Sequence, residues 1–433
     1  MKLTLENIGK LKHAVIDISG ITVIAGENNT GKSTVGKVLY SIFNSFYRLE
    51  DQLQREREES ISSALDVFYF RNMTSRMNAR VDSEEIAKNI LDNTSKYLES
   101  PDLLREYIYE AIGQYDETFA RHRHSETPDN DRSFENVLNR VMNVLNISDK
   151  EFFESVLTKR FEEEFNGQIN NIYTESEGMI SLQIKDECAT IFISDNEVTS
   201  STNLFRLETE VVYLDDPFVV DDPRAYRIIG RHGNMRYFGH RDHLRSKLFP
   251  PESSTNIINE ILASGKMESI YSKINTICSG EIVKRSRSYV GYRSSGSEAV
   301  LKMKNISTGL KTFVILKMLL QNGALKENGT IVLDEPEIHL HPEWQLLFAE
   351  IIVLIQKEFN MHILLNTHSP YFLNAIEVYS AKHEIDKRCK YYLSSLDGEN
   401  ARIQDVSDQI DKIYEKLARP LQRLENERYS DHD

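Results

Sequence analysis

The sequence predicts an α/β protein with a mixed sheet, an antiparallel β subdomain and a compact helical insertion. Three apolar runs that end on polar residues are the main evidence. Residues 21–25 stop at a glycine, residues 331–333 end on two carboxylates, and residues 363–365 end on Asn-Thr-His. Short apolar runs of this kind are typical of buried strands in α/β sheets, whose carboxyl ends meet ligands. We therefore expect three distant segments to form one site.

The first strand is followed by a loop that fits a nucleoside triphosphate. Residues 26–33, GENNTGKS, match the pattern G-x-x-x-x-G-K-[ST], and helical spacing of apolar residues follows. The glycines let backbone N–H groups wrap an anion at the positive end of the new helix. The predicted binding residues for ATP are Gly26, Glu27, Asn28, Asn29, Thr30, Gly31, Lys32, Ser33 and Thr34. Lys32 is expected to contact the β- and γ-phosphates, and the Ser33 hydroxyl is expected to bind Mg²⁺.

The other two strands supply candidate catalytic groups. We expect Asp334 to hold the hydrated Mg²⁺ and Glu335 to polarise the attacking water as general base. His368 either caps a loop or hydrogen-bonds the γ-phosphate. Because the phosphate loop and the two carboxylates are also present, we favour the second interpretation. Ser307 is a predicted N-cap, and Gly309 lies in the first turn of a helix that is apolar nearly all round. The N-terminus of that helix is either a plain cap or an anion site.

These motifs together resemble a known family. The ordered set GENNTGKS, ISTGL, IVLDEPEIHLHP and LLNTHSP is similar to the motifs of ABC-type ATPases of the SMC and OLD branch, and the DEPEIHLHP form resembles stand-alone ATPases of bacterial phage-defence systems, including Septu-type and retron-linked ones. The resemblance implies an ABC-type P-loop ATPase head that works as a homodimer or higher homo-oligomer. Ser307 and Gly309 of one subunit would contact the γ-phosphate bound by the other. Thr308, Leu310 and Lys311 depart from the usual signature, so slow or partner-dependent hydrolysis is conceivable.

The resemblance divides the chain between an ATPase head and insertions. The helical stripes after the first loop form no sustained heptads, so we expect a compact lobe and not a long coiled coil. The expected divisions are the N-terminal part of the head 1–34, the helical insertion 35–165, the sheet part of the head 166–220, a basic and helical insertion with a β-hairpin 221–300, the signature and acidic strand 301–380, and a C-terminal strand and helix 381–433.

Two further interpretations concern the middle and the end of the chain. Asp215, Asp216, Asp221 and Asp222 follow a strand near the place where relatives carry a magnesium-sensing glutamine, and we interpret them as solvated turn residues. The C-terminal segment is too short for the nuclease domain of OLD-type proteins. We therefore expect an Mg²⁺-dependent ATPase without its own nuclease domain.

Composition bounds the class of protein and its partners. The 433 residues are 40% hydrophobic, enough for a sizeable core, and no apolar run approaches the roughly 20 residues of a membrane helix. The cysteines Cys188, Cys278 and Cys389 are too few and too scattered for a disulfide framework. We therefore expect a cytoplasmic protein with no membrane partner.

The net charge of the chain and its local basic patch are compatible with two functional hypotheses. The net charge of −15 repels nucleic acid, so any DNA or RNA contact needs a local patch such as Arg224–Lys247, which holds seven basic residues and one acid. The first hypothesis is a regulatory ATPase subunit of an anti-phage defence or toxin system, acting with a separately encoded effector nuclease. The alternative is a DNA repair or recombination ATPase that clamps nucleic acid with this patch, with an affinity that falls steeply with salt.

Overall fold

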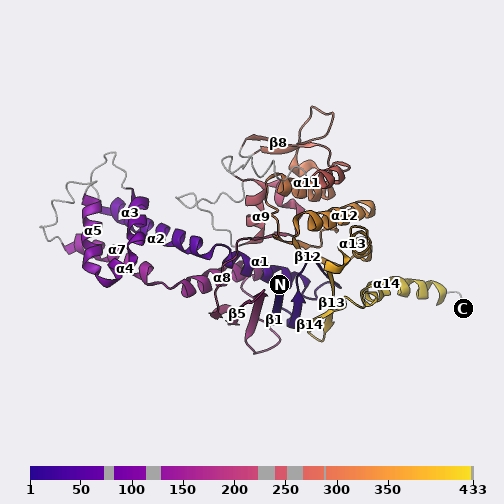
Figure 1. The fold of residues 1–433 in the computed structure, drawn as a ribbon, viewed down its shortest axis with the longest axis horizontal. Coiled ribbons are helices and arrows are strands. Elements are labelled where there is room, and N and C mark those ends of the chain that lie inside the picture. Colours follow the sequence, from indigo (N-terminus) through magenta and orange to yellow (C-terminus); the bar gives the residue numbers. More distant parts are fainter. Residues whose placement is uncertain (73–81, 114–127, 223–238, 251–266, 287–288, 431–433) are drawn as a thin grey trace. The chain divides into compact units, whose positions relative to one another are not determined.

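The computed structural model describes residues 1–72, 82–113, 128–222, 239–250, 267–286 and 289–430 (Figure 1). The chain forms two compact units, one of Met1–Tyr47 with Glu154–Asp433 and one of Arg48–Phe153. The larger unit contains the predicted nucleotide site. The smaller unit contains only helices in its described residues, namely α2 (Leu49–Asn72), α3 (Ser83–Asp92), α4 (Thr94–Glu99), α5 (Pro101–Gly113), α7 (Pro128–Asn146) and the start of α8 (Asp149–Phe165).

The larger unit is built on an 11-stranded mixed sheet with the strand order β6-β5-β4-β1-β2-β14-β13-β3-β12-β11-β7. Strands β13, β3, β12, β11 and β7 are parallel neighbours, and β1, β2, β4, β5 and β6 pair antiparallel. The α/β fold with a mixed sheet and an antiparallel subdomain is therefore confirmed. The strands are β1 (Lys2–Ile8), β2 (Leu11–Asp17), β3 (Ile21–Gly26), β4 (Gly178–Ile184), β5 (Glu187–Ser194), β6 (Glu197–Thr202), β7 (Val211–Leu214), β11 (Thr330–Asp334), β12 (His362–Thr367), β13 (Cys389–Asp397) and β14 (Asn400–Asp405).

Helices pack against this sheet, which buries the apolar side chains of both the strands and the helices. Strands β3 and β11 are buried along their whole length, and α11 is buried nearly all round. The core cluster joins residues of these elements with α12 and α13. Besides the end of α8 and helical residues 267–275, the described helices of the larger unit include α1 (Lys32–Phe46), α9 (His240–Leu248), α11 (Thr308–Gln321), α12 (Pro342–Phe359), α13 (Pro370–Lys382) and α14 (Asp411–Ser430), with short 3₁₀ turns η2 (Pro217–Asp221), η4 (Met303–Asn305) and η5 (Asp386–Arg388).

Three sequence expectations differ from the observed arrangement. The β-hairpin expected within residues 221–300 is present as β8 (Glu281–Ser286) and β9 (Tyr289–Arg293), but β10 (Leu301–Lys302) adds a third strand, and the three form a sheet of their own. The C-terminal segment contains a second strand, β14, which was not predicted because its short polar sequence has little of the hydrophobic pattern of a strand. The helical unit is shorter than the segment 35–165, because α1 packs on β7, β11 and β12 in the larger unit.

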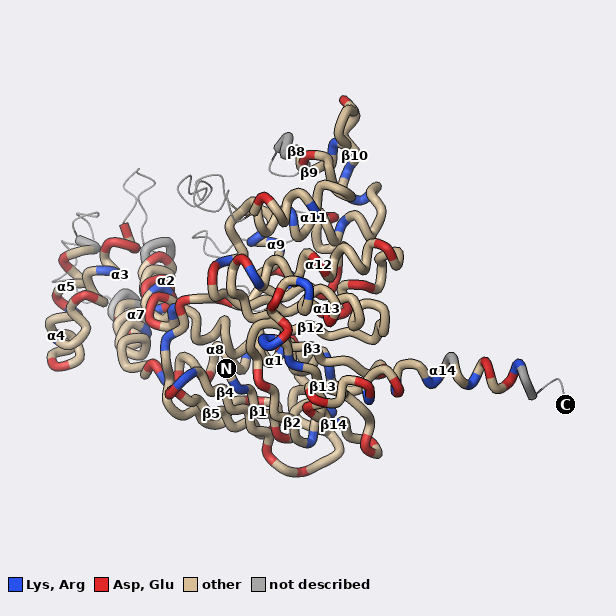
Figure 2. Tube along the Cα trace, turned by 45° about the vertical axis from the view of Figure 1, so that its right-hand side comes forward, with Lys and Arg blue, Asp and Glu red and all other residues tan. Residues whose placement is uncertain are grey.

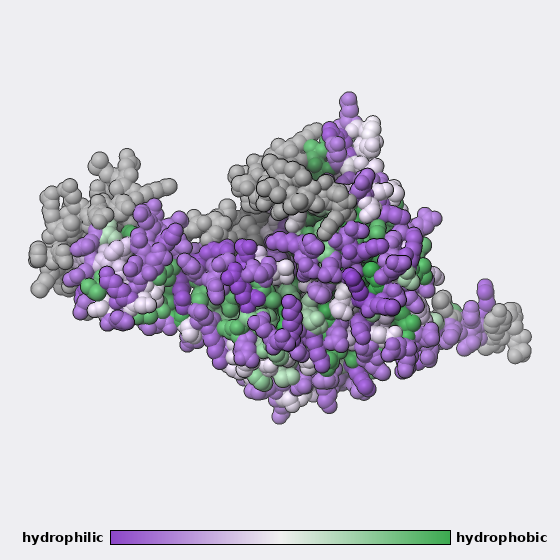
Figure 3. Space-filling view, viewed as in Figure 1, coloured by the Kyte–Doolittle hydropathy of each residue, from purple (hydrophilic) through white to green (hydrophobic). Residues whose placement is uncertain are grey.

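The surface of the protein is rich in polar and charged side chains, as its composition leads us to expect. The face of the protein in Figure 3 is mainly hydrophilic, with smaller apolar areas between polar side chains. Both acidic and basic residues occur along α14 (Figure 2). Among the described residues, no helix combines the length and the apolar character that crossing a membrane requires.

Candidate functional site

Strand order brings the three predicted segments to one edge of the sheet. Strand β12 lies between β3 and β11, with all three parallel, and Asn366 is paired with Asp334 while Thr367 is paired with Ala25. Parallel neighbours end at the same edge, so the phosphate loop, the two carboxylates and His368 follow adjacent strand ends. The expectation that these segments meet is confirmed by this register.

The backbone carbonyls of the predicted phosphate loop, residues 26–33, accept hydrogen bonds from Lys32 and from strand β13. The Lys32 ammonium is buried and donates to the carbonyls of Gly26 (3.1 Å) and Glu27 (2.8 Å). The Ser394 hydroxyl of β13 donates to the Thr30 carbonyl at 2.6 Å. A Cβ at Gly26 would lie 2.1 Å from the carbonyl oxygen of Ser394, so this glycine is required by close approach of β13.

The other loop residues face outward or turn the chain into α1. Gly31 has a φ of 82°, in the left-handed region that favours glycine, and it is the N-cap of α1. Glu27, Asn28, Asn29 and Ser33 are exposed, and Thr34 is half-buried. The loop therefore presents a cradle of small and polar groups at a helix N-terminus, which fits a phosphate chain.

Glu335 lies between two cationic groups. Its Oε1 atom is 3.4 Å from the Lys32 Nζ and 3.4 Å from the His368 Nδ1. The contact with His368 and the charge of Lys32 lower the pKa of Glu335, and Glu335 in turn raises the pKa of His368. Glu335 also has a φ of 50°, an uncommon conformation that costs on the order of 1–3 kcal/mol and is concentrated at functional sites. The residue is thus an ionised carboxylate in a strained position.

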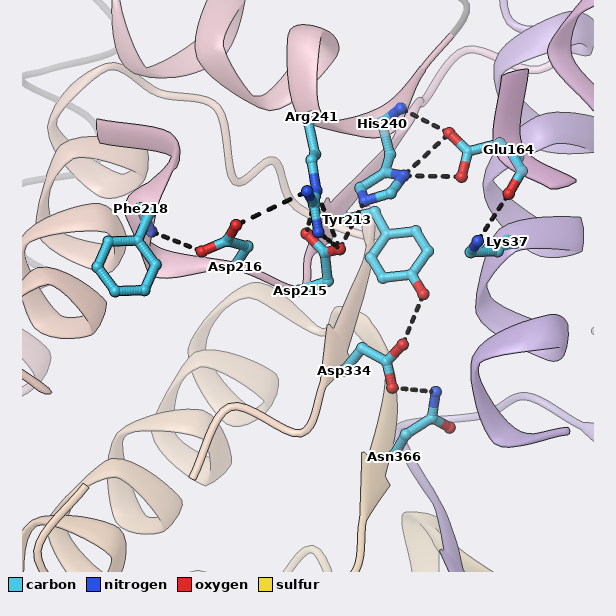
Figure 4. Close-up of polar contacts among 10 residues, drawn as sticks. All are labelled: Lys37, Glu164, Tyr213, Asp215, Asp216, Phe218, His240, Arg241, Asp334 and Asn366. Carbon is cyan, nitrogen blue, oxygen red and sulfur yellow. Dashed lines mark hydrogen bonds and ion pairs between the residues drawn. The ribbon is translucent and has the colours of Figure 1, made fainter. Parts of the chain in front are cut away.

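Asp334 is locked by partners that the sequence did not single out. It is buried, its Oδ2 accepts the Tyr213 hydroxyl at 2.7 Å, and its Oδ1 accepts the Asn366 side-chain amide at 2.9 Å (Figure 4). Tyr213 belongs to β7, which pairs with β11. A carboxylate has about four lone-pair positions, so these two hydrogen bonds fix its orientation and leave positions for a metal. Oxygen donors such as Asp334 and Ser33 are of the type that Mg²⁺ prefers.

Glu337 is a buried acid that sequence reasoning missed. Only 1% of its surface is exposed, its Oε1 accepts the Thr367 hydroxyl, and the His368 N–H approaches the same oxygen at 3.4 Å. Burial is the main cause that raises the pKa of Glu337 above its ordinary value of 4.5. The loop after β11 is therefore attached to the end of β12 by a buried carboxyl group.

We expect Glu337→Gln and Glu337→Ala to separate charge from hydrogen bonding. The alanine variant leaves the buried Thr367 hydroxyl without its acceptor and is expected to lose about 1–3 kcal/mol of unfolding free energy. The glutamine variant is expected to fold normally, because it keeps a neutral acceptor of the same size. A raised folded-state pKa means that the wild type loses stability relative to Glu337→Gln as pH rises above 4.5. Thermal unfolding at several pH values measures both effects; equal losses in the two variants would contradict this role.

Ser307 and Gly309 belong to the start of α11. The Ser307 Oγ accepts the Leu310 N–H at 3.4 Å, as expected for an N-cap, and Ser307 is exposed. A Cβ at Gly309 would lie 2.8 Å from the His339 carbonyl oxygen, so this helix start packs closely against the loop after β11. Within the described part of the chain, no hydrogen bond or ion pair joins Ser307 or Gly309 to Lys32, Glu335 or His368.

The acids after β7 are not simple solvated turn residues. Asp215 binds His240 (3.1 Å) and Arg241 (2.7 Å), and Asp221 pairs with the buried Lys311 of α11 at 2.7 Å. The interpretation was wrong for these two residues, because their partners come from distant helices. Burial by itself would lower the pKa of His240, but hydrogen bonds to Asp215 and Glu164 outweigh burial and raise the pKa to about 9.

The basic patch is only partly within the described residues. Arg224–Lys247 includes residues 224–238, which lie outside them. In the described remainder, Arg241 pairs with Asp215, Arg245 with Asp242 and Lys247 with Glu210. These described basic side chains are therefore engaged within the chain itself.

The fold and site define an α/β domain with a P-loop type of nucleotide site. The AAA ATPase domain family matches residues 1–373 of the chain. The chain therefore belongs to this family.

Comparisons with individual proteins add more distant likenesses. The Retron Vc95 probable ATPase of Vibrio cholerae serotype O1 biovar El Tor is 31% identical over 109 residues, which cover 22% of this chain and 20% of that protein. The match thus spans about a fifth of that relative.

The fold of this chain also has a distant likeness, at low TM-scores, to solved structures of SMC head domains. The SMC head domain from Thermotoga maritima has a TM-score of 0.38 and 11% identity, covering 94% of this chain and 98% of that one. The SmcHead bound to the C-winged helix domain of ScpA has a TM-score of 0.42 and 11% identity, covering 95% and 98%. The family assignment rests on the sequence match over residues 1–373.

Proposed function

We propose that this ATPase hydrolyses ATP with Mg²⁺ as a conformational switch, and that it is the regulatory subunit of a bacterial anti-phage defence or toxin system with a separate effector nuclease. The convergence of Lys32, Glu335 and His368 at adjacent strand ends is the observation that carries the hydrolytic part. The likeness to a retron ATPase supports the defence role. The effector is proposed on the resemblance of the motifs alone.

Each residue of the site has a role in this reaction. Lys32 and the loop N–H groups bind the β- and γ-phosphates, and Ser33 with Asp334 would hold Mg²⁺, which offsets phosphate charge when it is bound. Glu335 orients a water molecule and takes its proton as the oxygen attacks the γ-phosphorus. The bond to the β-phosphate oxygen then breaks, and ADP and phosphate leave. His368, which contacts Glu335, would hydrogen-bond the γ-phosphate.

Ser307 and Gly309 are proposed to act from a second copy of the chain. They start a helix whose positive end suits an anion, yet within the described residues no hydrogen bond or ion pair joins them to Lys32 or Glu335. A composite site would make dimer closure and ATP occupancy one equilibrium. Ser307 is exposed in the single chain, which is what contact with another copy requires.

The proposed dimer predicts an ATP-dependent change in mass. With hydrolysis blocked by Glu335→Gln, saturating Mg-ATP is expected to double the mass measured by light scattering. Adding Ser307→Arg is expected to keep the protein monomeric, because a bulky side chain then occupies the contact with the partner's phosphate. Ser297→Arg, at another exposed serine, serves as the control and is expected to dimerise. A monomer in both the Glu335→Gln parent and the control would reject the composite site.

A further inference from the structure

A buried cluster behind Asp334 is not used by the proposed chemistry. Tyr213 is fully buried in β7 and donates its hydroxyl to Asp334. The His240 ring of α9 stacks on the Tyr213 ring, with 4.3 Å between the ring centroids and 24° between the planes. Figure 4 shows the chain of contacts from His240 through Tyr213 to Asp334. The imidazole is therefore one aromatic ring away from the carboxylate.

His240 is itself fixed on both sides by acids. Its Nδ1 is 2.7 Å from the Glu164 Oε2, and its Nε2 is 3.1 Å from the Asp215 Oδ2. The Glu164 Oε1 also accepts the backbone N–H of His240 at 2.6 Å. A histidine with a carboxylate at each ring nitrogen is held as a doubly protonated cation in one orientation. Arg241 binds the outer side of Asp215, which completes the clamp.

The clamp joins four elements of the larger unit. Glu164 comes from α8, Asp215 follows β7, and His240 begins α9. The backbone carbonyl of Glu164 also accepts Lys37 of α1 at 2.6 Å, so α1, the helix that starts with Lys32, is attached to the same cluster. A buried cation that only stabilised the fold would not need to stack on the tyrosine that binds Asp334.

We propose that His240 is a positioning residue for the magnesium carboxylate: clamped by Asp215 and Glu164, it fixes the Tyr213 ring and thereby the hydrogen bond that orients Asp334. The inference rests on the proposed function, because it assigns Asp334 to Mg²⁺. Partners that hydrogen-bond a metal-binding carboxylate typically change metal affinity by about 10–100-fold when they are removed. We therefore expect Tyr213→Phe and His240→Gln each to weaken Mg²⁺ binding about tenfold, which is about 1.4 kcal/mol.

The proposal is tested by measuring Mg²⁺ and ATP binding in a variant that does not hydrolyse ATP. In the Glu335→Gln background, calorimetry gives ATP affinity with Mg²⁺ titrated and again with EDTA present. Both variants are expected to shift the Mg²⁺ dependence and to leave Mg²⁺-free ATP affinity unchanged. His243→Gln is the matched control, because His243 is also buried on the same helix and pairs with Glu210 at 2.9 Å, while the histidine ring that stacks on Tyr213 is that of His240.

A double-mutant cycle decides whether His240 acts through Tyr213. If it does, the double variant is about tenfold weaker for Mg²⁺ and not about a hundredfold weaker, because both changes remove one interaction. Additive effects, or an unchanged Mg²⁺ dependence in folded Tyr213→Phe, would overturn the proposal. Should His240→Gln fail to fold, Asp215→Asn, which removes one side of the clamp on His240, takes its place in the cycle. A Glu335→Gln parent that binds no Mg-ATP would instead reject the proposed function.

Discussion

Replacing Glu335 by glutamine is expected to lower ATP turnover by about 100-fold or more while leaving ATP affinity intact. The carboxylate is 3.4 Å from both Lys32 and His368, which keep it ionised and able to take a proton from water. Glutamine keeps the shape and the strained backbone position but cannot accept that proton. Phosphate release under saturating Mg-ATP measures the rate, and calorimetry measures the affinity.

An isosteric change at an unrelated glutamate controls for nonspecific effects. Glu399 is exposed in the turn between β13 and β14, and Glu399→Gln is expected to hydrolyse ATP at the wild-type rate. Turnover of Glu335→Gln within a few-fold of wild type would show that another group is the base.

Lys32→Ala is expected to reduce ATP affinity about 100-fold and to abolish measurable turnover. Hydrogen bonds to charged groups contribute about 1.5–3 kcal/mol each, and this ammonium is the buried cation of the phosphate loop. The variant also removes the donor to the carbonyls of Gly26 and Glu27, so the loop loses an internal anchor. Nucleotide titration measures the affinity, and circular dichroism checks that the fold is retained.

Lys326→Ala, at an exposed loop lysine, is the matched control and is expected to bind ATP normally. Normal nucleotide affinity in folded Lys32→Ala would contradict the assignment of residues 26–33 to the phosphates. Since Lys32 at the start of α1 and Glu335 after β11 contact each other, the two substitutions test the same site from two distant segments of the chain.

Local sequence was sufficient for the parts of the site that have local causes. The glycines and lysine of residues 26–33, the apolar strand before them and the helix after them are short-range patterns, and the loop formed as predicted. The strands that end at Asp334 and Thr367 were equally readable, since each is a short apolar run. The Ser307 N-cap followed from its place before an apolar helix.

Only the tertiary structure identified the residues that support the site. Tyr213 and Asp334 are 121 positions apart, and His240 is paired with Glu164 across 76 positions. Strand β14 was missed for a related reason, because it is held by pairing with β13 and β2 more than by its own pattern. Long-range hydrogen bonds depend on strand order, register and helix packing, which local propensity does not encode. The sequence by itself therefore determined which groups we propose for phosphate binding, and the packing of distant strands and helices decided which groups hold them in place.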